Sequence, residues 1–433
     1  MTINRSNLST SADGADIFIV DGANSPFTNF GNLTTSGNLA NAILGAADDI
    51  SIVNKSALMT SGDGSSGVAV GEPFGTHYDN VTVLNYGSIN ASGDVYDDGT
   101  TFAIAGGIEF YAGDHQTGIN YGSISAIEGM GLSGNDSTLL NFGTIEARGA
   151  GFYIEGIEQW LTNVTAINYG QIHVAGDFGG SYGIALLADF SVAKNYGAIQ
   201  VNGIHDFGIA MEGVGDRGEN YGTILGTAAE ARGALMVGEG NEFINRGSII
   251  TTGEDSVGIR WGSENESGTD AGTFTNYGVV SSVAWAVRAS DADEHVINRG
   301  KMTGEVDLGS GDDSYVAAAK GSLNGGLTLG DGNDLIVFER GGGSLTVTDF
   351  VAGAGTDDVI DLSGFGFASL GDVLAHASQS GTDVVLKLGG KDQITLDNVS
   401  LGSLAADDFS FASSFLGQSA ALAHVPHWDH LLS

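Results

Sequence analysis

Apolar and polar residues alternate in short runs along this chain, and apolar residues at helical spacing over ten or more positions are hard to find. One short pattern returns throughout the first three hundred residues: Asn, a variable residue, Gly, a small polar residue and an apolar residue. The third position is Gly in every copy but one, where Ser56 stands, and the fifth is apolar from Leu33 to Met302. The alternation predicts short β-strands, each leaving a tight corner.

The spacing of this pattern predicts how the strands are arranged. Its intervals run from 21 to 35 residues, most often 25, and a period in this range is typical of a stacked solenoid. A second Gly-rich, β-branched run follows in most repeats, as at Gly183 and Gly208, which predicts two or three strands per coil. We therefore predict an all-β fold, a right-handed parallel β-helix of about 11 coils over residues 1–303. The leading residues are Asn29, Asn54, Asn85, Asn120, Asn141, Asn168, Asn195, Asn220, Asn245, Asn276 and Asn298.

The residues of the corner each have a predicted role. Stacked asparagines can hydrogen-bond to one another and to the neighbouring backbone, so we expect a structural ladder at Asn85 and at every later leading Asn through Asn298. We expect the Gly two places later to supply the freedom in φ that a tight corner needs. The residue between them is aromatic in most copies but is Lys55, Arg246 or Arg299 in others, so it points outward. We expect this aromatic column to stabilise the rod, with sugar or partner binding as the alternative.

The charge balance excludes several classes of partner. Lys and Arg number 15 against 53 acidic residues, a formal net charge of −38, so nucleic acid and anionic membrane surfaces would be repelled and divalent cations attracted. The chain has no Cys, which excludes disulfides and thiolate metal sites. It contains no run of about 18 apolar residues, so membrane insertion is not expected. The N-terminal residues lack the basic and apolar regions of a cleavable export signal.

The pattern changes after residue 303. Two copies of a Gly-x-Gly-x-Asp-x-apolar turn follow, 21 residues apart, each with Leu in place of the first Gly of a calcium nonapeptide. Glycines let such a turn direct its carbonyl oxygens inward and the Asp adds a carboxylate, a ligand set that suits Ca²⁺. The alternative is a Gly-Asp turn that holds no ion. We expect Ca²⁺ to be the cofactor of a parallel β-roll over residues 304–411, with its ligands at Gly309, Gly311, Asp313, Gly330, Gly332 and Asp334.

Residues 305–411 resemble the repeats-in-toxin (RTX, hemolysin-type calcium-binding) C-terminal region. The resemblance rests on the two turns and on later segments such as Val347 to Phe350, Gly355 to Leu362 and Asp407 to Phe411. It implies a chain exported by type I secretion through an uncleaved C-terminal signal, located outside the cell or on its surface, and folded by extracellular Ca²⁺. Residues 412–433 are expected to form a flexible tail. The N-terminal coils resemble, more loosely, bacterial adhesin and autotransporter-like passenger domains.

Motifs for catalysis are weak in this sequence. The zinc-protease pattern His-Glu-x-x-His is absent, and one Gly-x-Ser-x-Gly around Ser181 lacks the strand-to-helix context of a nucleophile elbow. Five arginines come nearest to a basic column, but their spacings of 14, 14, 28 and 11 do not keep the coil period, which favours solvated or salt-bridged side chains over a uronate-binding groove. The histidines at the end of the chain could ligate Zn²⁺ or Ni²⁺ if they were ordered. The arginines are Arg232, Arg246, Arg260, Arg288 and Arg299, and the histidines are His424, His427 and His430.

Two functions remain. The first is a secreted, calcium-binding, non-catalytic structural or adhesin-type protein of the cell surface, matrix, surface layer or a filament, with a cell-surface glycan as a partner. Because an open solenoid end can pair with another, homotypic association, head-to-tail or lateral, belongs to this hypothesis. The alternative is an extracellular polysaccharide lyase, hydrolase or epimerase that uses a groove on the β-helix. The lack of a clear catalytic constellation favours the first.

Overall fold

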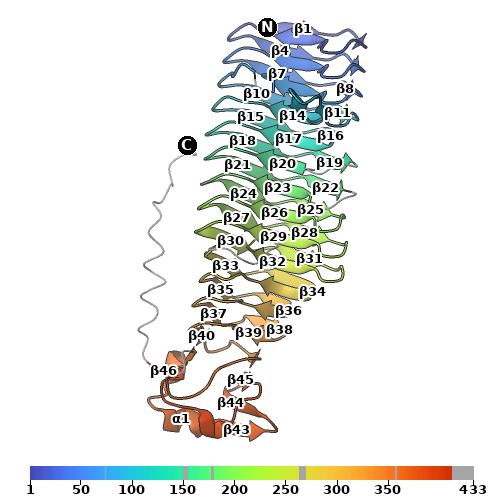
Figure 1. Ribbon diagram of the computed structural model, residues 1–433. Helices are drawn as coiled ribbons and strands as arrows, with labels where there is room; N and C mark the ends of the chain where they lie inside the picture. Colours follow the sequence, from blue (N-terminus) through green and yellow to red (C-terminus); the bar gives the residue numbers. More distant parts are fainter. Residues whose placement is uncertain (74, 150–154, 177–179, 263–269, 356–357, 412–433) are drawn as a thin grey trace.

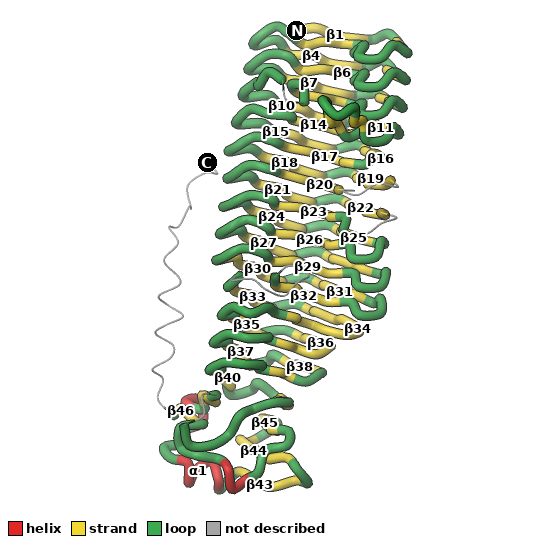
Figure 2. Tube along the Cα trace, viewed as in Figure 1, coloured by secondary structure: helices red, strands yellow, loops and turns green. Residues whose placement is uncertain are grey.

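The computed structural model describes residues 1–411 except 74, 150–154, 177–179, 263–269 and 356–357. It is a parallel β-solenoid in which three columns of strands run along one axis (Figures 1 and 2). The all-β parallel β-helix predicted from the repeats is therefore confirmed. The only α-helix among the described residues is α1 (Leu370–Leu374), so no described helix has the length or apolar character to cross a membrane.

The first column is a 16-stranded sheet whose neighbours all pair in parallel, and its members from β1 to β35 end on Asn. Alternate residues of these strands point into the core, as in the buried Val83 and Asn85 of β10. The strands are β1 (Thr2–Asn4), β4 (Pro26–Asn29), β7 (Ser51–Asn54), β10 (Thr82–Asn85), β15 (Thr117–Asn120), β18 (Thr138–Asn141), β21 (Thr165–Asn168), β24 (Val192–Asn195), β27 (Arg217–Asn220), β30 (Asn241–Asn245), β33 (Gly272–Asn276), β35 (His295–Asn298), β37 (Ser314–Ala317), β40 (Leu335–Phe338), β42 (Val359–Asp361) and β46 (Phe409–Ser410).

The second column starts just after each corner and carries the apolar fifth residue of the repeat inward, as with Ile89 and Ile124. Two of its strands, β34 and β36, are long enough to continue into the third column, so the corner between these columns is straightened there. The members are β2 (Leu8–Thr10), β5 (Leu33–Thr35), β8 (Ala57–Thr60), β11 (Ser88–Ala91), β16 (Ser123–Ala126), β19 (Thr144–Gly149), β22 (Gln171–Gly176), β25 (Ala198–Val201), β28 (Thr223–Gly226), β31 (Ser248–Thr251), β34 (Val279–Arg288), β36 (Lys301–Asp307) and β38 (Ser322–Asn324).

The strands of the third column pair in parallel along most of the solenoid. Near the C-terminal end the second halves of β34 and β36 occupy this column, and β39 follows them. Its inward residues, such as Ile157, Ile184 and Ile209, complete a core that is continuous from Val20 to Phe409. The strands are β3 (Phe18–Val20), β6 (Ile43–Gly45), β9 (Val68–Val70), β14 (Gly106–Phe110), β17 (Glu128–Leu132), β20 (Glu155–Gln159), β23 (Tyr182–Leu186), β26 (Phe207–Met211), β29 (Arg232–Met236), β32 (Val257–Trp261) and β39 (Leu327–Thr328).

The C-terminal end of the solenoid departs from this plan (Figure 1). There β43 (Ala377–Ser380), β44 (Asp383–Gly389) and β45 (Asp392–Leu396) form an antiparallel meander. Strand β45 pairs in parallel with β41 (Ser344–Val347), which in turn pairs with β39. The 3-10 turns η1 (Ser363–Phe365) and η2 (Leu401–Ser403) flank it, and a separate hairpin, β12 (Tyr96–Asp97) with β13 (Phe102–Ala103), leaves an earlier coil. Strand β36 crosses the expected boundary at 303/304, while a calcium-binding β-roll over 304–411 stays a prediction.

The corner glycines have a different role from the one expected. None of Gly122, Gly143 or Gly170 has a positive φ, so freedom in φ is not the reason for Gly. A Cβ on Gly122 would lie 1.9 Å from the carbonyl oxygen of Gly87, the corner glycine of the preceding coil. Gly is favoured because the stacked corners approach closely, and the one exception among the eleven copies, Ser56, has a small side chain.

Candidate functional site

The outward side of the third column, here called the third-column face, changes character along the solenoid axis. Core residues such as Ile157 alternate on each strand with outward residues, and the outward set is acidic in β14 to β20, aromatic in β23 and β26, and basic from β29 to β34. Because parallel pairing keeps the register, these side chains stack in straight rows.

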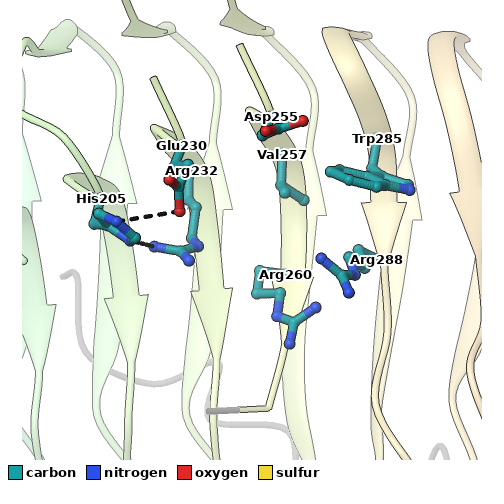
Figure 3. A pocket seen from close by; sticks show the side chains of 8 residues that line it. All are labelled: His205, Glu230, Arg232, Asp255, Val257, Arg260, Trp285 and Arg288. Carbon is teal, nitrogen blue, oxygen red and sulfur yellow. Dashed lines mark hydrogen bonds and ion pairs between the residues drawn. The ribbon is translucent and has the colours of Figure 1, made fainter. Parts of the chain in front are cut away.

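Three arginines meet at the basic end of this face. Arg232 begins β29, Arg260 lies in β32 and Arg288 ends β34, with Arg260 and Arg288 directly paired in the register. They line an open cavity of about 410 Å³ (Figure 3). The other lining side chains are His205, Glu230, Asp255, Val257 and Trp285. We call this cavity the arginine pocket.

Two of the three arginines pack against aromatic rings. The guanidinium of Arg232 lies 5.0 Å from the ring centre of Phe207, and that of Arg288 lies 4.8 Å from the ring centre of Trp285. His205 bridges two neighbours, with Nδ1 3.5 Å from Nη1 of Arg232 and Nε2 3.1 Å from Oε2 of Glu230. Planar guanidinium groups bind carboxylates through paired hydrogen bonds, so the pocket is suited to an anionic ligand.

The acidic end of the face is closed to solvent. Glu109, Glu128, Glu155 and Glu158 are each at most 5% exposed, although all lie on the outward side of their strands. Burial, followed by the charge of neighbouring Glu side chains, raises the pKa of Glu109, Glu128 and Glu155 well above its ordinary value. Glu155 and Glu158 are the least accessible of these groups, at 0% and 2% exposed, so they do not form the open carboxylate pair of a glycosidase.

The predicted calcium turns stack on one another at a corner of the solenoid. Gly309, Gly311, Gly330 and Gly332 have φ values of 92°, 132°, 100° and 150°, and Ser310 and Asp331 form a parallel bridge between the two turns. The Oδ1 atom of Asp313 accepts a hydrogen bond from the Glu294 amide at 2.7 Å, and Oδ1 of Asp334 accepts one from the Asp313 amide at 2.9 Å. The turns therefore have the left-handed glycines and inward carboxylates that the motif predicts.

Ordinary corners provide a test of whether these turns fit an ion. Asp216 makes the same bond to the preceding coil, from the Ser191 amide, and its second oxygen accepts a further bond from the Gly213 amide at 3.1 Å. In the calcium-type turns the corresponding amides, of Ser310 and Asp331, donate instead to backbone carbonyls of the preceding coil. As a result the Oδ2 atoms of Asp313 and Asp334 are buried with no hydrogen-bond partner among the described residues.

These two oxygens fit a cation, since a buried carboxylate oxygen without a partner is costly. Burial raises the pKa of Asp313 to about 9 and that of Asp334 to about 6. The two carboxylates do not belong to a group of three acidic side chains whose oxygens all lie within 4.8 Å of one another, among the residues described. An ion held here would therefore also need backbone carbonyl ligands, as the glycine-rich turn suggests.

The leading asparagines form one continuous chain of hydrogen bonds. Each Nδ2 donates to Oδ1 of the Asn in the next coil at 2.8 to 3.1 Å, and every ladder member is at most 6% exposed. Asn4 is a member that the repeat analysis missed, although Leu8 stands at the apolar position four residues later. After Asn298 the ladder stops, because its register partner in β37 is Ala317.

The aromatic column stacks face to face. Ring centres from Tyr86 to Tyr221 are 4.7 to 5.0 Å apart with interplanar angles of 5° to 12°, and Lys55 and Arg246 sit over the rings at the two ends of this run. The rings are 39% to 51% exposed, but only at their edges, because each face is covered by a neighbouring ring or cation. A sugar ring would need an open aromatic face, so this geometry favours the structural role.

The other sequence candidates that lie among the described residues do not form sites. Ser181 is 1% exposed and leads into strand β23 rather than a helix, while Gly179 of its motif lies outside the described residues. Arg246 stacks on Tyr277 and Arg299 pairs with Glu339 at 3.7 Å, both apart from the arginine pocket. The tail and its His424, His427 and His430 also lie outside the described residues.

Sequence reasoning missed the arginine pocket and the acidic stretch. Arg260 and Arg288 are one coil apart and paired, whereas Arg232 pairs with Val257, so Arg260 lies one 25-residue coil and three further residues from Arg232. Because the coils differ in length, a fixed period hides this alignment. The acidic stretch carries a readable signal in the segments Gly-Gly-Ile-Glu109, Glu128-Gly-Met-Gly and Glu155-Gly-Ile-Glu158, where Glu and Gly alternate.

Comparisons with known proteins give one partial match. No protein-family model matches the chain. Over 75 residues the chain is 40% identical to a protein named endo-1,3-1,4-beta-glycanase EglC, from Rhizobium meliloti (strain 1021). The matched stretch makes up 17% of this chain and 15% of that protein. The chain thus spans only a small part of that relative, and the match does not establish a shared family.

Proposed function

We propose that this protein is a secreted, non-catalytic β-solenoid that binds a carboxylate-bearing glycan in the arginine pocket and carries Ca²⁺ in its C-terminal turns. The observation that supports glycan binding is the meeting of Arg232, Arg260 and Arg288 beside Trp285 in an open cavity. On a chain with a net charge of −38, such a local cluster of positive charge is an exception.

The chemistry of the pocket favours a sugar acid over other anions. The arginines would bind the carboxylate in pairs of hydrogen bonds, while the half-buried indole of Trp285 offers an apolar surface to the sugar ring. A volume of about 410 Å³ is in the usual range for a small-ligand site, so a short stretch of the glycan would occupy it. The rest of the acidic glycan would be repelled by the negatively charged protein, and salt would screen this repulsion.

Calorimetric titration with oligogalacturonate, oligoalginate and a neutral β-glucan oligomer tests this proposal. We expect binding of a uronate oligomer that is lost when Arg232 and Arg260 are both replaced by Ala. The matched control is Arg148→Ala with Arg246→Ala, which removes the same charge away from the pocket. Equal affinity for neutral and acidic oligomers, or equal binding by both double variants, would contradict it.

The calcium part of the proposal rests on the unpartnered Oδ2 atoms of Asp313 and Asp334. Gly309, Gly311, Gly330 and Gly332 would let carbonyl oxygens complete the shell, and the bound ion would stabilise the folded state by mass action. Thermal unfolding of the full chain in Ca²⁺ and in EGTA tests it. We expect a lower melting temperature in EGTA, and a smaller difference in Asp313→Asn with Asp334→Asn. Secretion by a type I system, extracellular location and homotypic association stay predictions.

A second candidate is cleavage of the glycan in the same pocket. It is favoured by the name of the partial relative, an endo-glycanase, and by the titratable His205, Glu230 and Asp255 at the rim. Reducing-end and ultraviolet-absorbance assays on the same uronate polymers separate the candidates. Turnover that His205→Ala abolishes without weakening binding would favour the enzyme, and binding without turnover favours the non-catalytic protein.

A further inference from the structure

In the acidic stretch of the third-column face, Glu and Gly occupy neighbouring positions in two rows that cross β14, β17 and β20. In the register, Gly106 pairs with Glu128, which pairs with Glu155, while Glu109 pairs with Gly131, which pairs with Glu158. Glu109, Glu128 and Glu158 therefore each have a Gly beside them in the same row, whereas Glu155 lies between Glu128 and Tyr182. A Cβ on Gly131 would lie 1.9 Å from Oε1 of Glu128 and 2.2 Å from Oε2 of Glu109, so the carboxylates fill the space that a side chain would take.

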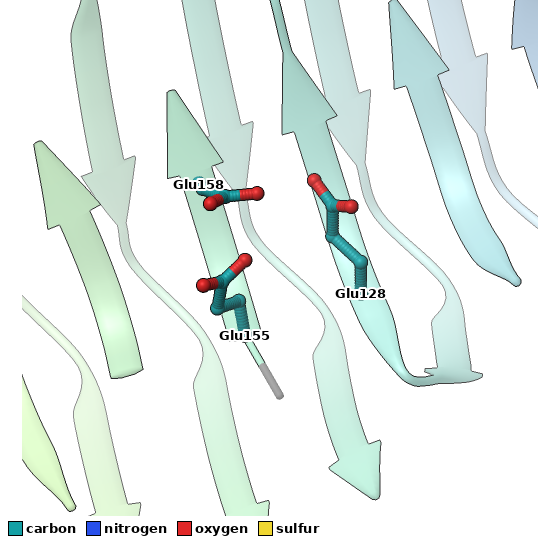
Figure 4. A group of neighbouring side chains, drawn as sticks. All are labelled: Glu128, Glu155 and Glu158. Carbon is teal, nitrogen blue, oxygen red and sulfur yellow. The ribbon is translucent and has the colours of Figure 1, made fainter. Parts of the chain in front are cut away.

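This arrangement brings carboxylates from neighbouring coils together. One oxygen each from Glu128, Glu155 and Glu158 lies within 4.8 Å of the other two. Glu155 and Glu158 lie on β20 and Glu128 lies on β17 (Figure 4). Two oxygens bound to one Ca²⁺ at about 2.3–2.6 Å are at most about 5 Å apart, so the three oxygens are close enough to share an ion.

Unmet hydrogen-bonding capacity points into the cluster. Glu155 is 0% exposed, and neither of its carboxylate oxygens has a hydrogen-bond partner among the described residues. Oε1 of Glu109 is buried and unpartnered in the same way. Natural proteins rarely leave buried carboxylates unpaired, because removing the charge from water costs several kcal/mol in order of magnitude. After burial, the strongest influence on each of these groups is the charge of another Glu.

We propose that Glu128, Glu155 and Glu158, with Glu109 beside them, hold a buried divalent cation of the hard, oxygen-binding class, for which Ca²⁺ is the probe. The cluster offers only carboxylate oxygens, and it contains no His or Cys, which does not suit Zn²⁺ or Ni²⁺. The ion would join three consecutive coils, β14, β17 and β20, on the side of the solenoid away from the core. This site is separate from the C-terminal turns and does not depend on the arginine pocket.

Counting tightly bound ions in the full-length protein tests the proposal. The protein is saturated with Ca²⁺, desalted and analysed by native mass spectrometry and by elemental analysis. The test variant is Glu155→Gln with Glu158→Gln, which keeps side-chain size. Its matched control is Glu239→Gln with Glu254→Gln, which removes the same charge from two exposed side chains. We expect the test variant to carry one ion fewer than both the control and the unmodified protein.

A second measurement keeps the test decisive if the first variant folds poorly. Asp313→Asn with Asp334→Asn removes the proposed C-terminal ligands and should leave the buried ion in place, so this variant should still retain Ca²⁺. If it retains none, or if all variants carry as many ions as the unmodified protein, the proposal is overturned. The competing explanation is that the carboxyl groups share protons. In that case Glu155→Gln with Glu158→Gln would raise the melting temperature equally in Ca²⁺ and in EGTA.

Discussion

The two ends of the third-column face share a backbone and differ in almost everything else. Around β17 and β20 the outward side chains include buried carboxylates, and both oxygens of Glu155 lack a hydrogen-bond partner among the described residues. Around β29 to β34 the outward arginines line a cavity beside Trp285, although Arg232 and Arg260 are only 9% and 5% exposed. The inward side chains hardly change, since Ile157, Ile184, Ile209 and Ile259 occupy the same row. In a solenoid the inward row fixes the fold, and the outward row is free to carry binding chemistry.

The open end gives the largest expected effect. Replacing Arg232 and Arg260 by Ala should lower the affinity for a uronate oligomer about 100-fold, because two charged hydrogen bonds at about 1.5 kcal/mol each add to about 3 kcal/mol. Titration calorimetry measures the change. Glu155→Gln with Glu158→Gln should leave that affinity unchanged, since these residues belong to the sealed end. Comparable losses in both double variants would remove the functional distinction between the two ends.

Substitutions in the Asn ladder should show that the scaffold beneath both ends is the same. Asn141→Ala, under the acidic end, and Asn245→Ala, under the basic end, each break two side-chain bonds to neighbouring asparagines. Each should lower the free energy of unfolding by about 1–3 kcal/mol, because buried amide groups lose their partners. Urea unfolding measures this, with the exposed Asn90→Ala as control. A large loss at one site only would mean that the ladder is not uniform.

The pH dependence of stability should separate the two ends further. The folded-state pKa of Glu109, Glu128 and Glu155 is raised, so the folded protein binds more protons than the unfolded chain, and in EGTA stability should fall as pH rises above about 4.5 toward the folded-state pKa values. Asp206, with a pKa of about 6, and Asp216, with about 7, contribute in the same direction.

Melting temperatures between pH 5 and pH 8 measure this slope. Glu155→Gln with Glu158→Gln should flatten it, and Arg232→Ala with Arg260→Ala should leave it unchanged. An unaltered slope in the Glu variant would show that these carboxyl groups do not titrate with unfolding. Saturating Ca²⁺ should also flatten the slope of the unmodified protein, because a bound cation favours the ionised carboxylates.

The smallest expected effect is on stability, when a corner carboxylate with hydrogen-bond partners for both oxygens is compared with one whose second oxygen has none. Asp216→Asn turns an oxygen that accepts from the Gly213 amide into an NH₂ group, which should cost about 1 kcal/mol with or without Ca²⁺. Asp313→Asn changes an oxygen without a partner, so in EGTA it should be neutral or stabilising, and in Ca²⁺ it should reduce the gain from the ion. Thermal unfolding in both conditions checks the pair. Identical behaviour of the two variants would contradict a special role for Asp313.

The fold was predictable because each coil repeats one short sequence pattern. The apolar position from Leu33 to Met302 and the leading Asn recur often enough to indicate a parallel solenoid, and both are buried as expected. The first coil was missed although Asn4, Arg5 and Ser6 repeat the pattern of Asn54, Lys55 and Ser56, with Leu at the apolar position in both copies. The role of the corner Gly was misjudged because the close approach involves a residue 25 or more positions away, which local conformational preference does not reveal.

The candidate sites were harder to predict because they depend on register between coils. Arg246 and Arg260 are close in sequence but lie in different columns, while Arg260 and Arg288 are a full coil apart and directly paired. Likewise, Glu128 and Glu155 become neighbours only through the pairing of β17 with β20. The calcium-type turns are an exception, since the proposed ligands of each turn lie within one short motif. Their glycines have the positive φ values that the motif requires.

The asparagine ladder also has a direction. Every amide donates toward the C-terminal coil and accepts from the N-terminal one, from Asn4 through Asn298. The side-chain dipoles therefore align head to tail, as peptide dipoles do in a helix, and give the solenoid an electrical polarity along its axis. Reversing one amide would break its bonds on both sides, so the orientation can change only for the whole ladder at once. The two ends of the solenoid are thus electrically distinct, independently of the charged residues on its surface.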